Sequence, residues 1–259
     1  MSQVDGTIHE VYIKDGARIN IRGKWKNGQI VSTEFNLPFV EPDPLAAAIS
    51  FTTSETATFT ATIGTIDKKT IVDWGDGVVE TKDTTSQLTF SHDYAGVSGD
   101  KQLDLTFKQG LKDVTYLDVS GQALSGYLSE VENMKSLQTL HGYSTSIQGD
   151  LAAIKELTAL SDCQLYSTNL GTYSASKLPG SDWDNINIDI NSCVDIDNQE
   201  ASQLLIDLDD SYQRTIPSGG TLDISGCNGG TLAYADLTAD GQAAYDDLTN
   251  NYGWTITTD

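Results

Sequence analysis

The sequence has few of the features that mark a membrane protein or a nucleic-acid-binding protein. No apolar run approaches the roughly 20 residues that a membrane-spanning helix requires. Lysine and arginine number 15 against 37 aspartates and glutamates, which gives a formal net charge of −22. Because a polyanionic surface repels phosphates, we expect no nucleic-acid partner and no membrane partner. A solvated acidic surface explains the charge most simply, and binding of a cation or a basic partner is the alternative.

Cysteine is scarce as well. Cys163, Cys193 and Cys227 lie 30 or more residues apart and form no CxxC pair. Since their number is odd, a closed disulfide framework is not expected, and we predict buried free thiols. The first residues, MSQVDGTIHEVYIKDG, contain no basic region followed by an apolar core. We therefore expect no secretory signal.

Motifs for catalysis are also missing. The phosphate-binding loop GxxxxGK[ST], the zinc motif HExxH and the nucleophile motif GxSxG do not occur. His9, His92 and His141 fall in three different segments, so a shared metal site or catalytic triad is not expected. We predict no catalytic residue, no cofactor and no metal ligand, and hence a protein that is not an enzyme.

Residues 1–40 alternate in hydropathy and are predicted to form an antiparallel β meander, within an N-terminal attachment module of residues 1–45. Asp-Gly and Asn-Gly pairs separate three alternating stretches, TIHEVYI, RINIRGKW and IVSTEFNLPF, and such pairs favour hairpin turns. Two prolines in the stretch 40–48 indicate a linker. Three strands alone are marginally stable, so we expect them to pack on a partner or on further copies of the chain.

Residues 46–110 are predicted to form a β-sandwich, because short Thr-, Phe- and Ile-rich stretches alternate with Gly and Asp turns. VDWGDG followed by FSHDYA resembles the PKD-type immunoglobulin-like domain, although Trp74 here directly precedes Gly75. The resemblance implies a structural motif in which the aspartate caps a turn and the aromatic side chains pack. Asp73, Asp76 and Asp93 are expected to cap turns in this way, with calcium binding as the alternative.

A repeat begins near residue 111. Apolar residues recur every 23 positions, as in Val114, Leu137 and Leu160. Cys163 follows Leu117 and Leu140 at the same spacing, and we call each such set of equivalent residues a column. This period and the L-x-x-L-x-L spacing are typical of leucine-rich repeats, so residues 111–259 are predicted to form a solenoid. Later strands centre on INIDINSC, TLDISGC and GWTITTD, and Trp254 is predicted to end the row of strand residues begun by Leu117.

The longer late repeats are predicted to contain helices. The stretch 198–212 places apolar residues at helical spacing, with Asn198 as its N-cap, and 239–253 is a weaker copy that Gly253 ends. One column is predicted to line the interior and to bond the backbone of neighbouring turns: Gln122, Thr145, Thr168, Cys193 and Cys227. The sandwich is expected to cover the first repeat, and the C-terminal residues the last. The predicted fold is therefore mainly β with an α/β solenoid.

Two groups of residues are candidates for binding. The strand face of the repeats should expose Tyr116, His141, Tyr143 and Tyr166, which suit recognition of a carbohydrate or protein, although a merely solvated face is the alternative. The meander carries a basic set that we predict to dock onto other proteins: Arg18, Arg22, Lys24 and Lys26, with Trp25.

The combination of a PKD-like module with short leucine-rich repeats ending in GWTI resembles virion proteins of phages and surface proteins of gut Bacteroidetes. This resemblance implies a non-enzymatic display protein of a phage particle: a capsid decoration, head fibre or tail-associated protein. Its partners would be other virion proteins, further copies through residues 1–45, and a host glycan or surface protein. The alternative is a bacterial cell-surface adhesin or glycan-binding protein.

Overall fold

The structure is a computed structural model, and the chain in it divides into two compact units, Met1–Pro44 and Leu45–Asp259. The described residues are 7–12, 18–26, 29–34, 47–66, 69–107, 111–175, 177–178, 183, 185–211 and 219–259; the first three ranges and Ala47 are described by their backbone only.

The first unit contains an antiparallel sheet in the order β1-β2-β3. Its strands are β1 (Thr7–Tyr12), β2 (Arg18–Lys26) and β3 (Gln29–Glu34). The alternation of hydropathy therefore predicted the meander correctly. Three predicted segments lie wholly or partly outside the described residues: the turns at 14–17 and 26–29 and the linker at 40–48.

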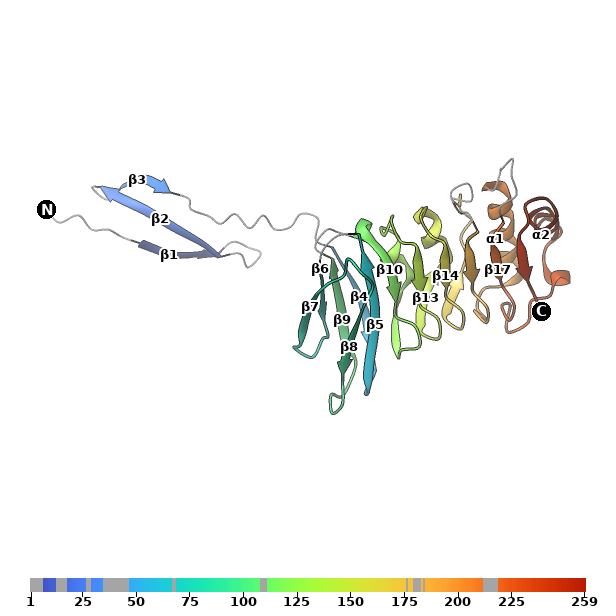
Figure 1. Ribbon diagram of the computed structural model, residues 1–259, viewed down its shortest axis with the longest axis horizontal. Helices are drawn as coiled ribbons and strands as arrows, with labels where there is room; N and C mark the ends of the chain where they lie inside the picture. The colour runs from blue at the N-terminus through green and yellow to red at the C-terminus, as the bar shows by residue number, and fades with distance from the viewer. Residues whose placement is uncertain are drawn as a thin grey trace. The chain divides into compact units, whose positions relative to one another are not determined.

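The second unit is built from two sheets that enclose one continuous core (Figure 1). The first sheet has the order β18-β17-β16-β14-β12-β10-β5-β8, and the second has the order β15-β13-β11-β4-β9-β6-β7. The chain is thus mainly β, as predicted. Its first six strands pair antiparallel: β4 (Ala47–Thr53), β5 (Thr58–Thr65), β6 (Lys69–Asp73), β7 (Val79–Asp83), β8 (Leu88–Asp93) and β9 (Lys101–Phe107).

The remaining strands are short and pair parallel with one another. They are β10 (Val114–Asp118), β11 (Leu124–Tyr127), β12 (Thr139–His141), β13 (Ser146–Asp150), β14 (Asp162–Gln164), β15 (Asn169–Thr172), β16 (Asn187–Asp189), β17 (Thr221–Asp223) and β18 (Thr255–Thr257). Between them lie the 3-10 helices η1 (Leu111–Asp113), η2 (Leu128–Val131), η3 (Leu151–Glu156) and η4 (Tyr234–Asp236), and the α-helices α1 (Asn198–Ser211) and α2 (Ala239–Asn251). Each turn of chain therefore adds one strand to the first sheet.

One residue of each parallel strand in the first sheet points into the core and pairs with its counterparts in the neighbouring strands. The paired residues are Leu117, Leu140, Cys163, Ile188, Leu222 and Ile256. All six are buried. The predicted row is thus correct up to Leu222 and wrong at its end, because Ile256 rather than Trp254 pairs with Leu222. Trp254 is also buried, but it precedes β18, and its N–H donates to Leu248 O at the end of α2.

The second sheet does not keep the 23-residue register of the repeat. Gly126 pairs with Ile147, and Gly149 pairs with Leu170, so each pairing is offset by two positions from the sequence columns. A shift of two residues leaves every side chain on the same face, since successive side chains alternate. Leu124, Ile147 and Leu170 therefore all remain buried despite the slip.

Segments 46–110 and 111–259, predicted as separate domains, belong to one compact unit. Both sheets continue across the predicted boundary, since β5 pairs antiparallel with β10 and β4 with β11. The sandwich strands cover the first repeat near Val114, as expected. The exact domain limits stay a prediction.

Both α-helices form where the sequence predicts them, but the first has a different cap. Asp197, not Asn198, is the N-cap: its carboxylate accepts hydrogen bonds from the N–H groups of Gln199 and Glu200, both at 2.9 Å. Glu200 in turn accepts from the Asp197 N–H at 3.0 Å, which completes a capping box. Asn198 is helical instead. Tyr212, predicted on the buried face of this helix, lies outside the described residues.

Candidate functional site: the open face of the parallel sheet

Each parallel strand of the first sheet offers two outward positions around one buried residue. In β12, β14 and β16 the central residue is buried and both flanking residues are partly exposed. Parallel pairing aligns these outward positions in two rows. One row contains Tyr116, Thr139, Asp162, Asn187, Thr221 and Thr255, and the other contains Asp118, His141, Gln164, Asp189, Asp223 and Thr257. We call these two rows and the residues next to them the strand face.

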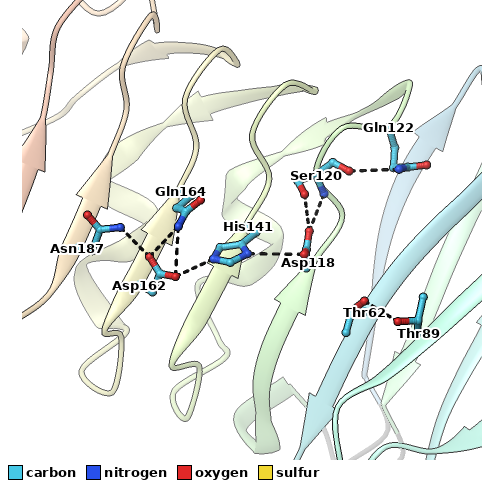
Figure 2. Close-up of polar contacts among 9 residues, drawn as sticks. All are labelled: Thr62, Thr89, Asp118, Ser120, Gln122, His141, Asp162, Gln164 and Asn187. Carbon is cyan, nitrogen blue, oxygen red and sulfur yellow. Dashed lines mark hydrogen bonds and ion pairs between the residues drawn. The ribbon is translucent and has the colours of Figure 1, made fainter.

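On the strand face, His141 lies between the carboxylates of Asp118 and Asp162 (Figure 2). Its Nε2 is 2.8 Å from Asp162 Oδ2, and its Nδ1 is 3.6 Å from Asp118 Oδ2. The three residues come from three neighbouring strands, β12, β14 and β10, so the imidazole links them across the sheet.

Both carboxylates make further hydrogen bonds. Asp118 Oδ1 accepts from Ser120 N at 3.0 Å and from Ser120 Oγ at 2.6 Å. Asp162 Oδ1 accepts from Asn187 Nδ2 at 2.8 Å and from Gln164 Nε2 at 3.2 Å. These bonds fix the two carboxylates on either side of the imidazole.

The polar network continues at both ends of the face. Thr221 Oγ1 donates to Asn187 Oδ1 at 2.5 Å, which extends the network to β17. At the other end Gln122 accepts from Thr60 N at 3.2 Å, so the network reaches β5 in the sandwich. Figure 2 shows that the threonine pair Thr62 and Thr89, with hydroxyls 3.0 Å apart, lies beside it on β5 and β8.

The protonation states follow from these contacts. Asp118, and to a smaller extent Asp162, raise the pKa of His141 above its usual value against the opposing effect of burial. Burial opposes ionisation of both aspartates, but the hydrogen bonds from His141 and from neighbouring polar groups outweigh it and lower their pKa values. These contacts therefore shift the equilibrium of His141 toward an imidazolium between two carboxylates.

Aromatic side chains stand beside this bridge. The rings of Tyr143 and Tyr166 are stacked, with centroids 4.5 Å apart and an interplanar angle of 7°. Tyr116 meets His141 edge to face at 5.9 Å, and Tyr143 lies 6.2 Å from the same imidazole. The four predicted recognition residues are thus brought together, and all four are partly exposed.

Sequence reasoning did not foresee how Asp162 connects these residues. It predicts that Tyr116 and His141 share the outward face, but it pairs His141 with neither aspartate. The signal was present, because Asp162 directly precedes Cys163 in the strand column and so occupies an outward position. Its distance from His141 depends on the lateral pairing of β12 with β14, which sequence spacing alone does not give.

The aspartates of the PKD-like motif form hydrogen bonds within turns. Asp73 Oδ1 accepts from Gly75 N, Asp76 Oδ1 from Val78 N, and Asp93 Oδ1 from Ala95 N, at 2.9 to 3.0 Å. The second oxygen of Asp76 contacts His92 Nε2 at 2.7 Å. These contacts favour the turn-capping interpretation over calcium binding.

The aromatic residues of the same motif pack around the turn. His92 stacks on Trp74 with centroids 5.0 Å apart. The buried Tyr94 hydroxyl donates to Trp74 O at 2.7 Å. The motif therefore holds the sandwich together, as the resemblance implied.

The cysteines are buried free thiols, as predicted. Cys193 Sγ donates to Leu165 O at 3.3 Å, and Cys227 Sγ donates to Ile190 O at 3.4 Å, so each bonds the backbone of the preceding turn. Thr145 and Thr168, in the same column, instead bond carbonyls three residues back in their own turns. The prediction is therefore correct for Cys193 and Cys227 and wrong for the two threonines, which bond the backbone of their own turns. It is also wrong for Gln122, which is only half-buried and bonds Thr60 and Ser120.

For the predicted docking residues the structure gives only the backbone. Arg18, Arg22, Lys24, Trp25 and Lys26 all lie on β2, whose register pairs Trp25 with Ile30 and Lys24 with Ser32 across to β3. Their side chains lie outside what the structure describes, so the docking role stays a prediction.

Comparison with known proteins does not assign this chain to a family: no family model, curated protein or solved structure matches it. Within the described residues, no helix has the length and apolar character needed to cross a bilayer.

Proposed function

We propose that this chain is a non-enzymatic display protein whose strand face binds a molecule on a host surface. The observation that carries the proposal is the gathering of Tyr143, Tyr166, Tyr116 and His141 on one open, hydrogen-bonding sheet face. Tyrosines combine large contact area with a polar tip, which suits recognition of glycans and proteins. Since both imidazole nitrogens of His141 face carboxylates, neither is available as a base toward a bound molecule, which favours binding over catalysis.

We further propose that the stacked turns after residue 111 are leucine-rich repeats in an α/β solenoid, capped by the PKD-like sandwich. The buried row from Leu117 to Ile256 and the column of backbone-bonding Thr and Cys residues support this interpretation. Such an arrangement presents a broad, rigid surface in which each turn contributes outward residues at a fixed spacing.

The location that we propose is a phage particle, with the basic strand β2 docking onto other virion proteins or further copies of the chain. The support is the resemblance of the PKD-like motif and repeats to virion proteins, together with the contrast between the basic β2 and the acidic remainder of the chain. Many weakly binding copies on one particle would then attach by avidity. A bacterial cell-surface adhesin with the same face is the second candidate, supported by the same resemblance.

The binding proposal is tested with the full-length chain on host cells and on an immobilised mucin glycoprotein. Tyr166→Ser should weaken binding by about tenfold, the equivalent of one lost aromatic contact of about 1.4 kcal/mol. Tyr127→Ser is the matched control, because Tyr127 is 58% exposed and lies on β11 of the other sheet. Equal loss in both variants, or binding to neither surface, would contradict the proposal.

The location is tested by mass spectrometry of purified particles and of the cell-surface fraction from the source. Peptides of this chain in particles, at many copies per portal, would support the virion assignment. Their recovery only from cell envelopes would favour the adhesin. A variant with Arg18, Arg22, Lys24 and Lys26 changed to Gln should be lost from particles, and unchanged incorporation would overturn the docking role.

A further inference from the structure

The bridge through His141 depends on a single proton. An imidazolium has two N–H donors, whereas a neutral imidazole has one donor and one acceptor. Protonated His141 can therefore satisfy both Asp118 and Asp162, but neutral His141 can donate to only one of them. The other carboxylate would then face a nitrogen lone pair, which is repulsive.

The tyrosines of the face are in contact with this bridge. His141 touches Tyr116 edge to face and lies tilted against Tyr143, which in turn stacks on Tyr166. A reorientation of the imidazole would therefore reach Tyr116 and Tyr143 through direct ring contacts, and Tyr166 through its stack on Tyr143.

We propose that His141 is a proton-controlled brace of the strand face, and that loss of its proton loosens the tyrosine cluster and weakens ligand binding. This inference rests on the proposed function of the face and adds its regulation. Below the transition, His141 ties β10, β12 and β14 together and holds Tyr116 and Tyr143 in place. Above it, one of the two links opens and the face loses one positive charge.

The groups that face His141 set the direction of this switch. These groups are Asp118 and Tyr116 on β10, Asp162 on β14, and Tyr143 in the segment that follows β12. The next charged residue along the row is Asp189 on β16, whose pKa is raised by burial and by Asp223 and Asp162. All the charged neighbours are acidic, so they favour the protonated imidazole.

Tyr116 and Tyr166 do not titrate in the same range. Burial, followed by neighbouring acidic and phenolic groups, raises the pKa values of Tyr116 and Tyr166 above 10. A change in the packing of the strand face between pH 6 and 9 is therefore attributable to His141 and not to ionisation of these two rings.

The first test is a residue-resolved NMR titration of the full-length chain from pH 5 to 9. The imidazole nitrogens of His141 should titrate above pH 6.5, and ring signals of Tyr116 and Tyr143 should shift with the same midpoint. Tyrosine signals that stay constant while His141 titrates would overturn the brace. Because this readout needs no ligand and no variant, it decides the inference even if the host ligand is never found.

The second test measures binding to the immobilised mucin glycoprotein and to host cells at pH 6 and at pH 9. Affinity should fall roughly fivefold on going to pH 9, the equivalent of about 1 kcal/mol for one partly buried ion pair. His141→Gln should bind weakly and equally at both pH values. Asp240→Asn, at an exposed carboxylate of α2 outside the strand face, is the control, and it should keep the pH dependence of the unchanged protein.

The outcomes separate the two proposals. Binding that is equal at both pH values in the unchanged protein refutes the regulation but leaves the display function standing. Coupled NMR titration without binding to either surface supports the brace and refutes the proposed ligand surface.

Discussion

At the scale of single residues, Gly75 shows how strictly the backbone of the PKD-like turn restricts the sequence. Its φ of +76° lies in the left-handed region, and a Cβ there would come within 2.2 Å of Gln102 O. Gly77, two residues later, also has a positive φ of +94° but has open space around it. A comparison of substitutions at the two glycines therefore distinguishes the cost of a left-handed backbone from the cost of a steric clash.

We predict that Gly75→Ala is far more damaging than Gly77→Ala. Gly77→Ala should cost about 1 kcal/mol, because only the left-handed backbone is unfavourable. Gly75→Ala adds a backbone clash that β6 and β9 must separate to relieve, so it should cost at least about 3 kcal/mol. The measurement is the free energy of unfolding in urea. Equal losses in the two variants would show that the clash is relieved without cost.

The thiols make a second prediction at this scale. Burial raises the pKa of Cys227 to about 12 and also raises the pKa values of Cys163 and Cys193. Because the thiolate is the reactive form, none of the three should react with a thiol reagent at pH 8 in the native protein. All three should react once the chain is unfolded in urea. Rapid labelling of a single cysteine before unfolding would argue against the buried column.

The position of a residue could be predicted where it recurs in a column of the repeat. Its contacts with residues of neighbouring strands could not. Cys193 and Cys227 were recognised as interior residues because they repeat at one position after the strand. The partnership of His141 with Asp162 joins residues 21 positions apart, and nothing in the local spacing selects that pair over others.

At the scale of elements, α1 and α2 were predictable from helical spacing, while the chemistry between them was not. The two helices pack together, and Asp209 on α1 lies close to Asp247 on α2. Among the described residues, Asp209 Oδ1 is buried without a hydrogen-bond partner. Burial, followed by Asp247 and then Asp210, raises the pKa of Asp209 to about 6.

This pair should make stability depend on pH. The pKa of Asp209 is raised from 3.8, so folding favours its protonated form. The stability from that proton is complete below pH 3.8, declines as the pH rises to about 6, and is absent above it. Asp209→Asn should therefore stabilise the protein by about 1 kcal/mol at pH 7.5, after allowance for solvent screening, and by nothing near pH 3.5.

The measurement is urea unfolding at both pH values, with Asp100→Asn in an exposed loop as the control. The control should show no such difference between the two pH values. A gain for Asp209→Asn that is the same at both pH values would rule out the raised pKa of Asp209 as its cause.

At the scale of the whole molecule, the continuity of both sheets joins the sandwich to the repeats. Without residues 46–110, β10 would lose its pairing with β5, and β11 would lose its pairing with β4. Leu117 and Leu124, now buried, would lose the sandwich that covers them. A stack of repeats with an uncovered end is unstable, since each repeat buries its core only against neighbours.

We therefore predict that residues 45–259 fold as one cooperative unit, and that residues 111–259 alone do not. Circular dichroism during urea unfolding should show a single transition for 45–259, with a midpoint close to that of the full chain. The separate piece 111–259 should show little cooperative transition. If it unfolded with the same midpoint, the sandwich would be an independent domain that contributes nothing to the repeats.

The sequence by itself determined the periodic part of this protein: the alternation of the meander, the turns of the PKD-like motif, the 23-residue columns and the apolar faces of two helices. These are set by local backbone geometry and by the requirement that every turn bury the same positions. Only the tertiary structure decided which columns become neighbours across the sheets. It ended the buried row at Ile256, shifted the second sheet by two residues, and placed His141 between Asp118 and Asp162. Lateral strand pairing sums many weak contacts between distant residues, so no short stretch of sequence encodes it.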